Sequence, residues 1–232
     1  MSDTTPHMKA VPEIFADENA LASALAERVA ALAAEAVAAR GRFALAIPGG
    51  SVLSLLARGL PPRTDASQWH LFWTDERCVP LADPRSNFHL AETELLPKLP
   101  GARVHPVRGS AADYETEIAP FLPLDLALLG LGEDGHVASL FPGNPALLET
   151  SRAVADVHGA PKPPPDRVTL TLPALNRARQ LLVVASGSAK APIVARIFSA
   201  PSGLPARLLR PANGDLRWLL DRAAAAHLED LP

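Results

Sequence analysis

The sequence lacks the features that mark disulfide-bonded, membrane-spanning or nucleic-acid-binding proteins. Cys78 is the only cysteine, so no internal disulfide can form. No run of eighteen apolar residues is present, and the first ten residues lack a basic segment followed by an apolar one, so we expect neither a membrane span nor a secretory signal. The formal net charge of −3 argues against a general nucleic-acid binder. We therefore expect a soluble, cytoplasmic monomer whose partner is a small molecule.

The 232 residues, 48% of them hydrophobic, are enough to form the core of an α/β domain. Short apolar runs and stretches with helical spacing alternate along the chain. The strands that we expect are 43–47, 69–73, 103–107, 124–131, 152–157, 167–172, 181–186 and 216–220. The helices that we expect are 19–39, 52–58, 86–96, 111–119, 188–198 and 221–228. This alternation predicts a single α/β domain over residues 1–232, with a mostly parallel sheet and helices on both faces in a doubly wound, Rossmann-like fold.

The most informative segment is 126–143, where an apolar strand breaks into glycines and then reaches Glu133, Asp134 and His136. Its glycines match the dinucleotide-binding pattern G-x-G-x-x-G, but Pro142 comes too soon for the long helix that this pattern requires, and the two acids would repel a pyrophosphate. Histidine is the side chain best suited to proton transfer near neutral pH. The segment thus indicates either a proton-transfer site or a glycine-flanked turn with an exposed histidine.

Three further clusters follow predicted strands, and each has a structural alternative. Gly49-Gly50-Ser51 suits an anion because its N–H groups begin a helix, yet it could equally be a tight turn with Ser51 as the helix cap. Arg77 can grip a phosphate or carboxylate, although the acidic pair before it fits a solvated strand end. Lys190, after the expected cap Ser188, brings a charge to the sheet edge or is an exposed helix lysine.

The joint placement of these clusters says more than any one of them. In a parallel sheet the carboxyl ends of the strands share one edge, so the glycine loop, the cations and the acid–histidine pair converge there. The sequence therefore predicts a phosphate site beside a proton-transfer site. The remaining histidines show no metal-ligand spacing and Cys78 is solitary, so we expect no metal.

The motifs resemble those of the 6-phosphogluconolactonase family over about residues 40–220. The matching segments are 48–51, 73–80 with 86–88, 129–143, 167–173 and 187–190, with 134–143 the most specific. The resemblance implies hydrolysis of 6-phospho-D-glucono-1,5-lactone in the oxidative pentose phosphate pathway, without a metal or another cofactor. Val52-Leu53 stand where the family loop usually continues with Thr-Pro, which removes a side-chain hydroxyl at position 52.

The resemblance also assigns expected roles to individual residues. His136 is expected to be the general base. As a mechanistic hypothesis, Asp134 orients its imidazole or tunes its charge, and either backbone N–H groups or Arg77 donate hydrogen bonds to the oxyanion. The residues expected to bind the substrate are Gly49, Gly50, Ser51, Asp75, Arg167 and Lys190. Whether Asp75 or Glu76 takes part in catalysis or only holds Arg77 is left open by the sequence.

Two other functions compete with the lactonase interpretation. An aminosugar-phosphate deaminase or isomerase would share the phosphate loop, the acid and the histidine, but it carries an Asn-Glu-Pro element where this chain has residues 138–142. A non-catalytic sugar-phosphate sensor usually has a DNA-binding helix-turn-helix ahead of its ligand domain. Only about forty residues precede the glycine loop here, and they resemble one Ala-rich helix.

Overall fold

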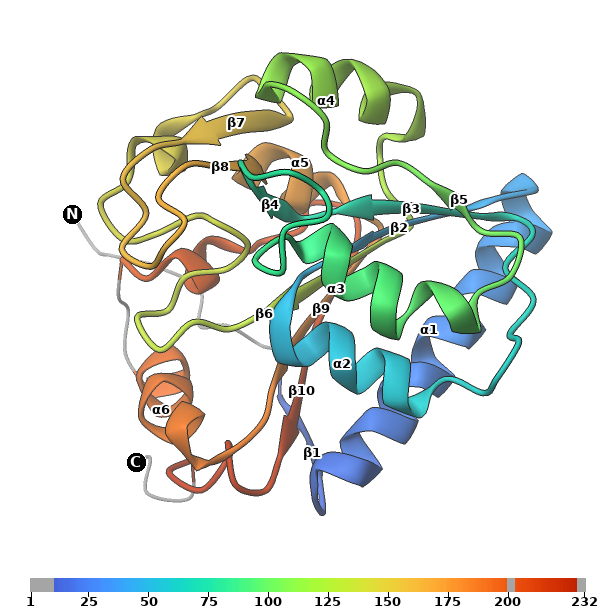
Figure 1. Ribbon diagram of the computed structural model, residues 1–232. Helices are drawn as coiled ribbons and strands as arrows, with labels where there is room; N and C mark the ends of the chain where they lie inside the picture. Colours follow the sequence, from blue (N-terminus) through green and yellow to red (C-terminus); the bar gives the residue numbers. More distant parts are fainter. Residues whose placement is uncertain (1–10, 200–202, 229–232) are drawn as a thin grey trace.

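A seven-stranded parallel sheet forms the centre of the computed structural model, which describes residues 11–199 and 203–228 (Figure 1). All neighbouring strands in this sheet run parallel, as the alternation of strands and helices predicted. In spatial order its strands are β1 (Glu13–Phe15), β10 (Asp215–Asp221), β9 (Gln180–Ala185), β6 (Leu126–Gly130), β2 (Phe43–Ile47), β3 (Trp69–Trp73) and β5 (Arg103–Val104).

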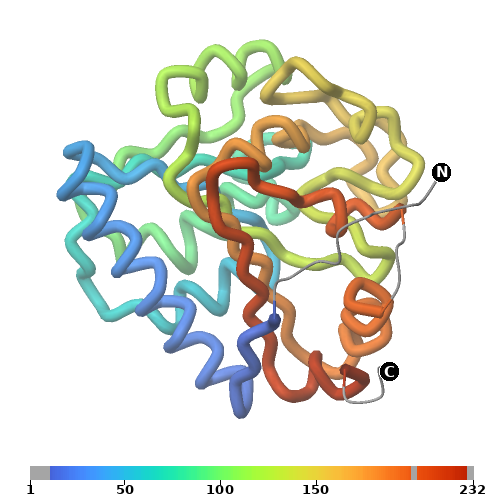
Figure 2. Tube along the Cα trace, turned by 180° about the vertical axis from the view of Figure 1, so that it is seen from behind, coloured from blue at the N-terminus to red at the C-terminus, as the bar shows by residue number. Residues whose placement is uncertain are grey.

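Helices cover both faces of the sheet. Figure 1 shows α1, α2 and α3 on one side, with α4 and α5 on the other, and Figure 2, seen from behind, shows α1 as the long blue helix at the lower left. The α-helices are α1 (Glu18–Arg40), α2 (Gly50–Gly59), α3 (Asn87–Glu94), α4 (Ala111–Ile118), α5 (Leu172–Arg177) and α6 (Ala191–Ser199). Short 3₁₀ turns are η1 (Leu96–Lys98), η2 (Ala119–Phe121), η3 (Pro145–Leu148), η4 (Ser188–Lys190) and η5 (Pro205–Leu208). The mostly parallel, doubly wound α/β class is therefore confirmed.

The central strands are apolar because helices bury both of their faces. All five residues of β2 and all five of β3 are buried, so these strands read as continuous apolar runs rather than alternating ones. The helix α1 begins where Asp17 accepts hydrogen bonds from the amides of Asn19 and Ala20, and it ends at Gly41, whose φ of 69° is the left-handed conformation that glycine adopts readily.

A second, three-stranded antiparallel sheet lies apart from the central one. It consists of β4 (Asp75–Arg77), β8 (Arg167–Leu170) and β7 (Val154–Val157), in that spatial order. Only Thr74 separates β4 from the end of β3, so the chain leaves the central sheet and enters the small one within a single residue. The small sheet thereby stands next to the carboxyl edge of the central strands.

The strand order reverses between β2 and β6. From β2 the chain runs outward to β3 and β5, whereas β6 is followed on its other side by β9 and β10. In open parallel sheets a crevice forms beyond the carboxyl ends of the strands at such a switch point, and ligands bind there. The Gly49–Ser51 segment follows β2 and the His136 segment follows β6, so both stand at this crevice.

Several expected elements differ in the structure. The closing helix expected over 221–228 is wrong: β10 continues to Asp221 and turns follow, because the Asp221 carboxylate accepts hydrogen bonds from the amides of Gly187 and Ala224. The strand expected over 103–107 contains only Arg103–Val104. The edge strand β1 was missed because three residues show no measurable period. Among the described residues, no helix is long and apolar enough to cross a membrane.

Candidate active site

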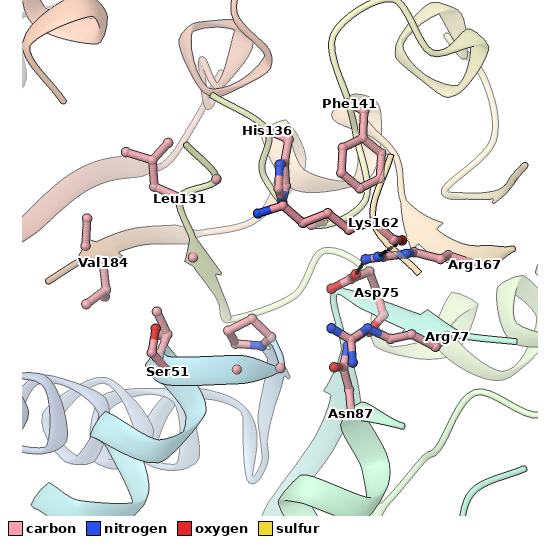
Figure 3. Close-up of a pocket in the computed structure, with 18 of the residues that line it drawn as sticks. Ser51, Asp75, Arg77, Asn87, Leu131, His136, Phe141, Lys162, Arg167 and Val184 are labelled. Atoms are coloured by element: carbon pink, nitrogen blue, oxygen red, sulfur yellow. Dashed lines mark hydrogen bonds and ion pairs between the residues drawn. The ribbon is translucent and has the colours of Figure 1, made fainter. Parts of the chain in front are cut away.

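A cavity of about 310 Å³ lies at the switch point, between the ends of the parallel strands and the small antiparallel sheet (Figure 3). Eight of the nine residues that the sequence singled out line it, and the ninth, Asp134, contacts the His136 side chain. The eight lining residues are Gly49, Gly50, Ser51, Asp75, Arg77, His136, Arg167 and Lys190. The convergence that the sequence predicted is therefore present in the fold, with side chains and loops from five different regions of the chain.

The His136 imidazole is held from behind by Asp134. Its Nδ1 lies 2.5 Å from the Asp134 Oδ1, and the same oxygen accepts the His136 backbone N–H at 3.1 Å. A carboxylate on Nδ1 favours the tautomer with the proton on that nitrogen, which leaves the lone pair on Nε2. The His136 side chain is only 17% exposed, packs on the Phe141 ring and lines the cavity, so Nε2 is the nitrogen available to a substrate.

Glycines make this arrangement possible. A Cβ on Gly132 would lie 2.1 Å from the His136 Nδ1, which no side chain can tolerate. The Gly132 amide also donates to the His136 carbonyl, and Gly135 turns the chain with a φ of 82°. No helix begins within residues 136–144, all of which the structure describes, so the helix that a dinucleotide-binding fingerprint needs is absent there. The G-x-G-x-x-G match builds an acid–histidine turn instead.

The electrostatics of this turn favour an ionised Asp134. Partial burial pushes the pKa of the Asp134 carboxyl upward, but the hydrogen bonds and positive charge that His136 contributes outweigh burial and hold this pKa below its ordinary value. An ionised carboxylate in contact with Nδ1 stabilises a protonated imidazole. Asp134 is thus placed to orient the ring and to balance the charge that His136 acquires when it takes a proton.

The glycine loop after β2 presents the start of α2 to the cavity. Gly49 is the N-cap residue and makes no side-chain capping bond, so Ser51 lies inside the first turn and the cap expected at Ser51 is wrong. The first-turn N–H groups of a helix have no partner within the helix and carry a partial positive charge. A Cβ on Gly49 would lie 1.8 Å from the Asn87 Oδ1, so only glycine fits between the loop and α3. The loop provides a backbone site for an anion.

Asp75 and Glu76 are neighbours with different surroundings. The Glu76 carboxylate accepts hydrogen bonds from the amides of Asn87 and Phe88 and from the Ser86 hydroxyl, at 2.7–3.0 Å. Burial raises the pKa of Glu76, and these hydrogen bonds offset part of that rise. Glu76 therefore anchors the start of α3 and is absent from the cavity lining, whereas Asp75 faces the cavity from the same strand.

Asp75 belongs to a buried network with Ser139 and Arg167. The Ser139 hydroxyl donates to the Asp75 Oδ2 at 2.6 Å, and the Arg167 Nη1 lies 3.3 Å from the Ser139 Oγ and 3.7 Å from the Asp75 Oδ2. The Arg167 side chain is 6% exposed, and burial lowers its pKa. Its Nε and Nη2 donate to the carbonyls of Pro164 and Lys162. Most of the donors of Arg167 are thus used within the protein.

The Arg77 guanidinium lines the cavity and makes fewer hydrogen bonds within the protein than that of Arg167. Its Nη1 donates to the Arg85 carbonyl at 2.5 Å, while its buried Nε has no hydrogen-bond partner among the described residues. A buried donor without a partner costs free energy that a bound anion would recover. Figure 3 shows Arg77 beside Asp75 and Asn87, on the small-sheet side of the cavity.

Two lysines line the cavity, and the sequence analysis identified only one. Lys190 ends η4, whose N-cap is Gly187 with no side-chain cap, so the expected Ser188 cap is wrong. Burial lowers the pKa of Lys190, and the positive charge of Lys162 lowers it further. Lys162 was missed because it stands in the proline-rich run 161–165, which reads simply as a loop. A charged side chain inside an otherwise rigid proline run was the signal available.

Other expectations about the site concern metals and Cys78. Within residues 11–199 and 203–228, no group of three or more His, Cys, Asp or Glu side chains is arranged to hold a metal ion. Cys78 is exposed, and burial of its sulfur together with nearby acids raises the pKa of its thiol, so the structure gives it no activated thiolate.

Comparison with known proteins agrees with the geometry. A profile of the family described as "Glucosamine-6-phosphate isomerases/6-phosphogluconolactonase" matches residues 16–218. The 6-phosphogluconolactonases of Rattus norvegicus and Homo sapiens are 42% and 43% identical to this chain, each over 91% of both sequences. A solved 6-phosphogluconolactonase from Shewanella baltica superposes with a TM-score of 0.84 at 26% identity, covering 92% of this chain and 98% of its own.

Proposed function

This chain belongs to the glucosamine-6-phosphate isomerase/6-phosphogluconolactonase family, and we propose that it hydrolyses 6-phospho-D-glucono-1,5-lactone to 6-phospho-D-gluconate. One observation carries the proposal: His136, with its Nδ1 held by Asp134, lines the same cavity as the uncapped start of α2. A base for water and a site for a phosphate are thus separated by one small cavity, as a phosphorylated lactone requires.

The phosphate end of the substrate lies at the glycine loop in this proposal. The N–H groups that begin α2, together with the Ser51 hydroxyl, face the phosphate oxygens. Arg77 and Lys190 supply positive charge from either side of the loop. Val52 lacks the side-chain hydroxyl of the threonine that the family usually has at this position, but its backbone N–H remains in the first turn of α2. Binding at this distant end holds the lactone carbonyl in position, so that binding free energy is converted into orientation.

The lactone ring lies at the His136 end. His136 Nε2 takes a proton from a water molecule, whose oxygen attacks the lactone carbonyl carbon while the carbonyl electron pair moves to oxygen. Asp134 stabilises the resulting imidazolium through Nδ1. When the tetrahedral intermediate collapses, the bond to the ring oxygen breaks and that oxygen takes the proton from His136. The product is the open-chain acid, and His136 returns to its neutral form.

We propose that no metal ion takes part. A side-chain base can activate the water, and a charged side chain that donates a hydrogen bond to the lactone carbonyl oxygen can stabilise the oxyanion. The proposal also places the enzyme in the cytoplasm as a monomer within the oxidative pentose phosphate pathway. Light scattering of the purified protein tests the monomer, and activity after treatment with a chelator tests the absence of a metal.

The segment after His136 favours a lactonase over an aminosugar-phosphate deaminase. Here Ser139 is fully buried, donates to Asp75 and receives a hydrogen bond from Arg167. The acid that a deaminase would share is therefore held in a structural network, and residues 138–142 lack the Asn-Glu-Pro element of the deaminases. His136, whose Nε2 faces the cavity, is therefore the group that we propose as the base.

The experiment is a hydrolysis assay with freshly generated 6-phosphogluconolactone. We expect the wild-type protein to accelerate formation of 6-phosphogluconate well above the spontaneous rate, with or without a chelator. Ammonia release from glucosamine 6-phosphate is measured in parallel. Ammonia release without lactone hydrolysis would replace the proposal with a deaminase, and binding of 6-phosphogluconate without any turnover would replace it with a sensor.

A further inference from the structure

Lys162 lines the cavity but comes from a loop rather than from a strand end. The residue is exposed in the loop between β7 and β8, and its side chain extends into the cavity on the His136 side (Figure 3). Among the residues that the structure describes, none forms a hydrogen bond or ion pair with its Nζ. Its ammonium group is therefore available to a ligand.

The loop that carries Lys162 is anchored by Arg167. The Arg167 Nη2 donates to the Lys162 carbonyl at 2.8 Å, and its Nε donates to the Pro164 carbonyl at 3.1 Å. Pro163 and Pro164 restrict the backbone immediately after the lysine. A buried arginine thus fixes the backbone from which Lys162 extends, which reduces the freedom that the lysine would lose on meeting a substrate.

The charge at Lys162 acts inside the cavity. Its positive charge lowers the pKa of Lys190, so the two ammonium groups share one electrostatic environment. The cavity acids do not neutralise Lys162, because Asp75 is engaged by Ser139 and Arg167, and Asp134 by His136. An anion that develops near His136 would meet this charge.

We propose that Lys162 is a catalytic residue that donates a hydrogen bond to the lactone carbonyl oxygen as it becomes an oxyanion. The inference rests on the proposed lactone hydrolysis. As the water oxygen bonds to the carbonyl carbon, the carbonyl electron pair moves onto oxygen, where the Lys162 ammonium stabilises it without transferring its proton. The pair returns to re-form the carbonyl when the bond to the ring oxygen breaks. Arg167 acts through the loop and is a positioning residue.

Lys162 suits this role better than Arg77, which the sequence offered as a donor beside backbone N–H groups. Figure 3 shows Arg77 with Asp75 and Asn87, away from His136, whereas Lys162 extends toward the histidine. The attacking water must lie near the His136 Nε2, so the carbonyl oxygen forms its charge within that end of the cavity. Arg77 then serves the phosphate or the sugar hydroxyls.

The test is Lys162→Met, which removes the charge and keeps most of the side-chain length. We expect kcat for 6-phosphogluconolactone to fall by roughly 10- to 100-fold. This loss is smaller than that for removal of a typical oxyanion-hole donor, because Lys162 is exposed to solvent. KM and the inhibition constant of inorganic phosphate change by less than about threefold, since the phosphate end is untouched. Lys98→Met, which removes the same charge far from the cavity, retains wild-type kcat.

The outcomes separate the inference from the function on which it depends. If the wild-type protein does not accelerate hydrolysis, the proposed function and the inference both fail. If the wild type is active and Lys162→Met matches it in kcat, only the inference fails. A raised KM and weaker phosphate inhibition at unchanged kcat would also overturn it, by placing Lys162 at the phosphate. Partial recovery of kcat in Lys162→Arg supports a role for the charge.

Discussion

The two walls of the cavity use their polar groups in opposite ways. One wall comes from the ends of the parallel strands, with the glycine loop after β2, His136 after β6 and Lys190 after β9. The other comes from the small antiparallel sheet, with Asp75 and Arg77 on β4 and Arg167 on β8. On the strand-end wall the groups leave an atom free for a ligand. On the small-sheet wall they chiefly bind one another or nearby carbonyls.

The difference follows from how each wall is built. A parallel strand ends at an open edge, where loops and helix starts leave backbone N–H groups unpaired. The small sheet instead places charged residues opposite each other, with Arg77 directly across from Arg167. Like charges so placed repel unless each has its own acceptors. Arg77 binds the Arg85 carbonyl and Arg167 binds two loop carbonyls. We infer that the general base and the phosphate site belong to the strand-end wall, whereas the small sheet supports the cavity and contributes Lys162 through its β7–β8 loop.

A large loss of activity is expected for Gly132→Ala, which tests the turn that holds His136. The new Cβ would lie 2.1 Å from the His136 Nδ1, so the imidazole or the turn must move by more than an ångström. Because a displacement of that size in a reacting group costs about 10²-fold in rate, we expect kcat to fall by roughly that factor in the hydrolysis assay. Gly203→Ala is the matched control, since no atom of the described residues lies within 4 Å of its Cβ position. Wild-type kcat in Gly132→Ala would remove the acid–histidine turn from the mechanism.

A smaller effect, on KM rather than on kcat, is expected for Lys190→Ala. Loss of a charge-assisted contact to phosphate costs about 1.5–3 kcal/mol, or roughly tenfold or more in KM. We expect kcat to stay within about threefold of the wild-type value, because the reacting atoms are unchanged. Steady-state kinetics with the phosphorylated lactone checks the split. An unchanged KM would show that Lys190 does not face the phosphate.

Glu76→Gln tests the supporting wall. A glutamine side chain can accept only at one oxygen and brings an N–H₂ group toward the amides that the carboxylate now accepts. We expect the free energy of unfolding to fall by about 1–3 kcal/mol in urea titrations, with kcat per folded molecule retained. A large loss of kcat at unchanged stability would instead make Glu76 part of the chemistry.

The smallest effect concerns pH and Asp134. Its folded-state pKa lies below the ordinary 3.8, so its contribution to stability is fully present above about pH 4 and is lost as pH falls through the lowered value. The carboxylate is 42% exposed, so solvent screens this contribution. We expect the stability difference between the wild type and Asp134→Asn at about pH 5 to shrink as the pH falls below about 4. A difference that grew with acid would contradict this linkage.

Much of the fold was predictable because its strands are continuous apolar runs separated by helices of ordinary length. The alternation predicted the parallel sheet and most element bounds within a few residues, as for α1 and β3. The small sheet was not predictable as a separate unit, because β4 pairs with β8 about ninety residues away. The expected closing helix was wrong because an Ala-rich segment has helix propensity, whereas in the structure the Asp221 carboxylate at the end of β10 accepts a long-range hydrogen bond from the Gly187 amide and a local one from the Ala224 amide.

The candidate site was predictable where local chemistry and backbone signals coincide. Glycines next to Asp134 and His136 marked a turn with a titratable group, and the structure brings that turn to the cavity. The roles of Asp75 and Glu76 were not separable, because successive strand residues face opposite sides and a three-residue strand gives no period. Lys162 was missed because the hydrogen bonds from buried Arg167 to the carbonyls of its loop depend on tertiary packing.

The most direct test of the division between the walls is kcat of His136→Ala with fresh 6-phosphogluconolactone, measured beside the exposed control His227→Ala. We expect His136→Ala to lose roughly 10²- to 10⁴-fold in kcat, as removal of a general base does, while His227→Ala matches the wild type. An active wild type whose His136→Ala variant keeps its kcat would contradict the assignment of the general base to the strand-end wall.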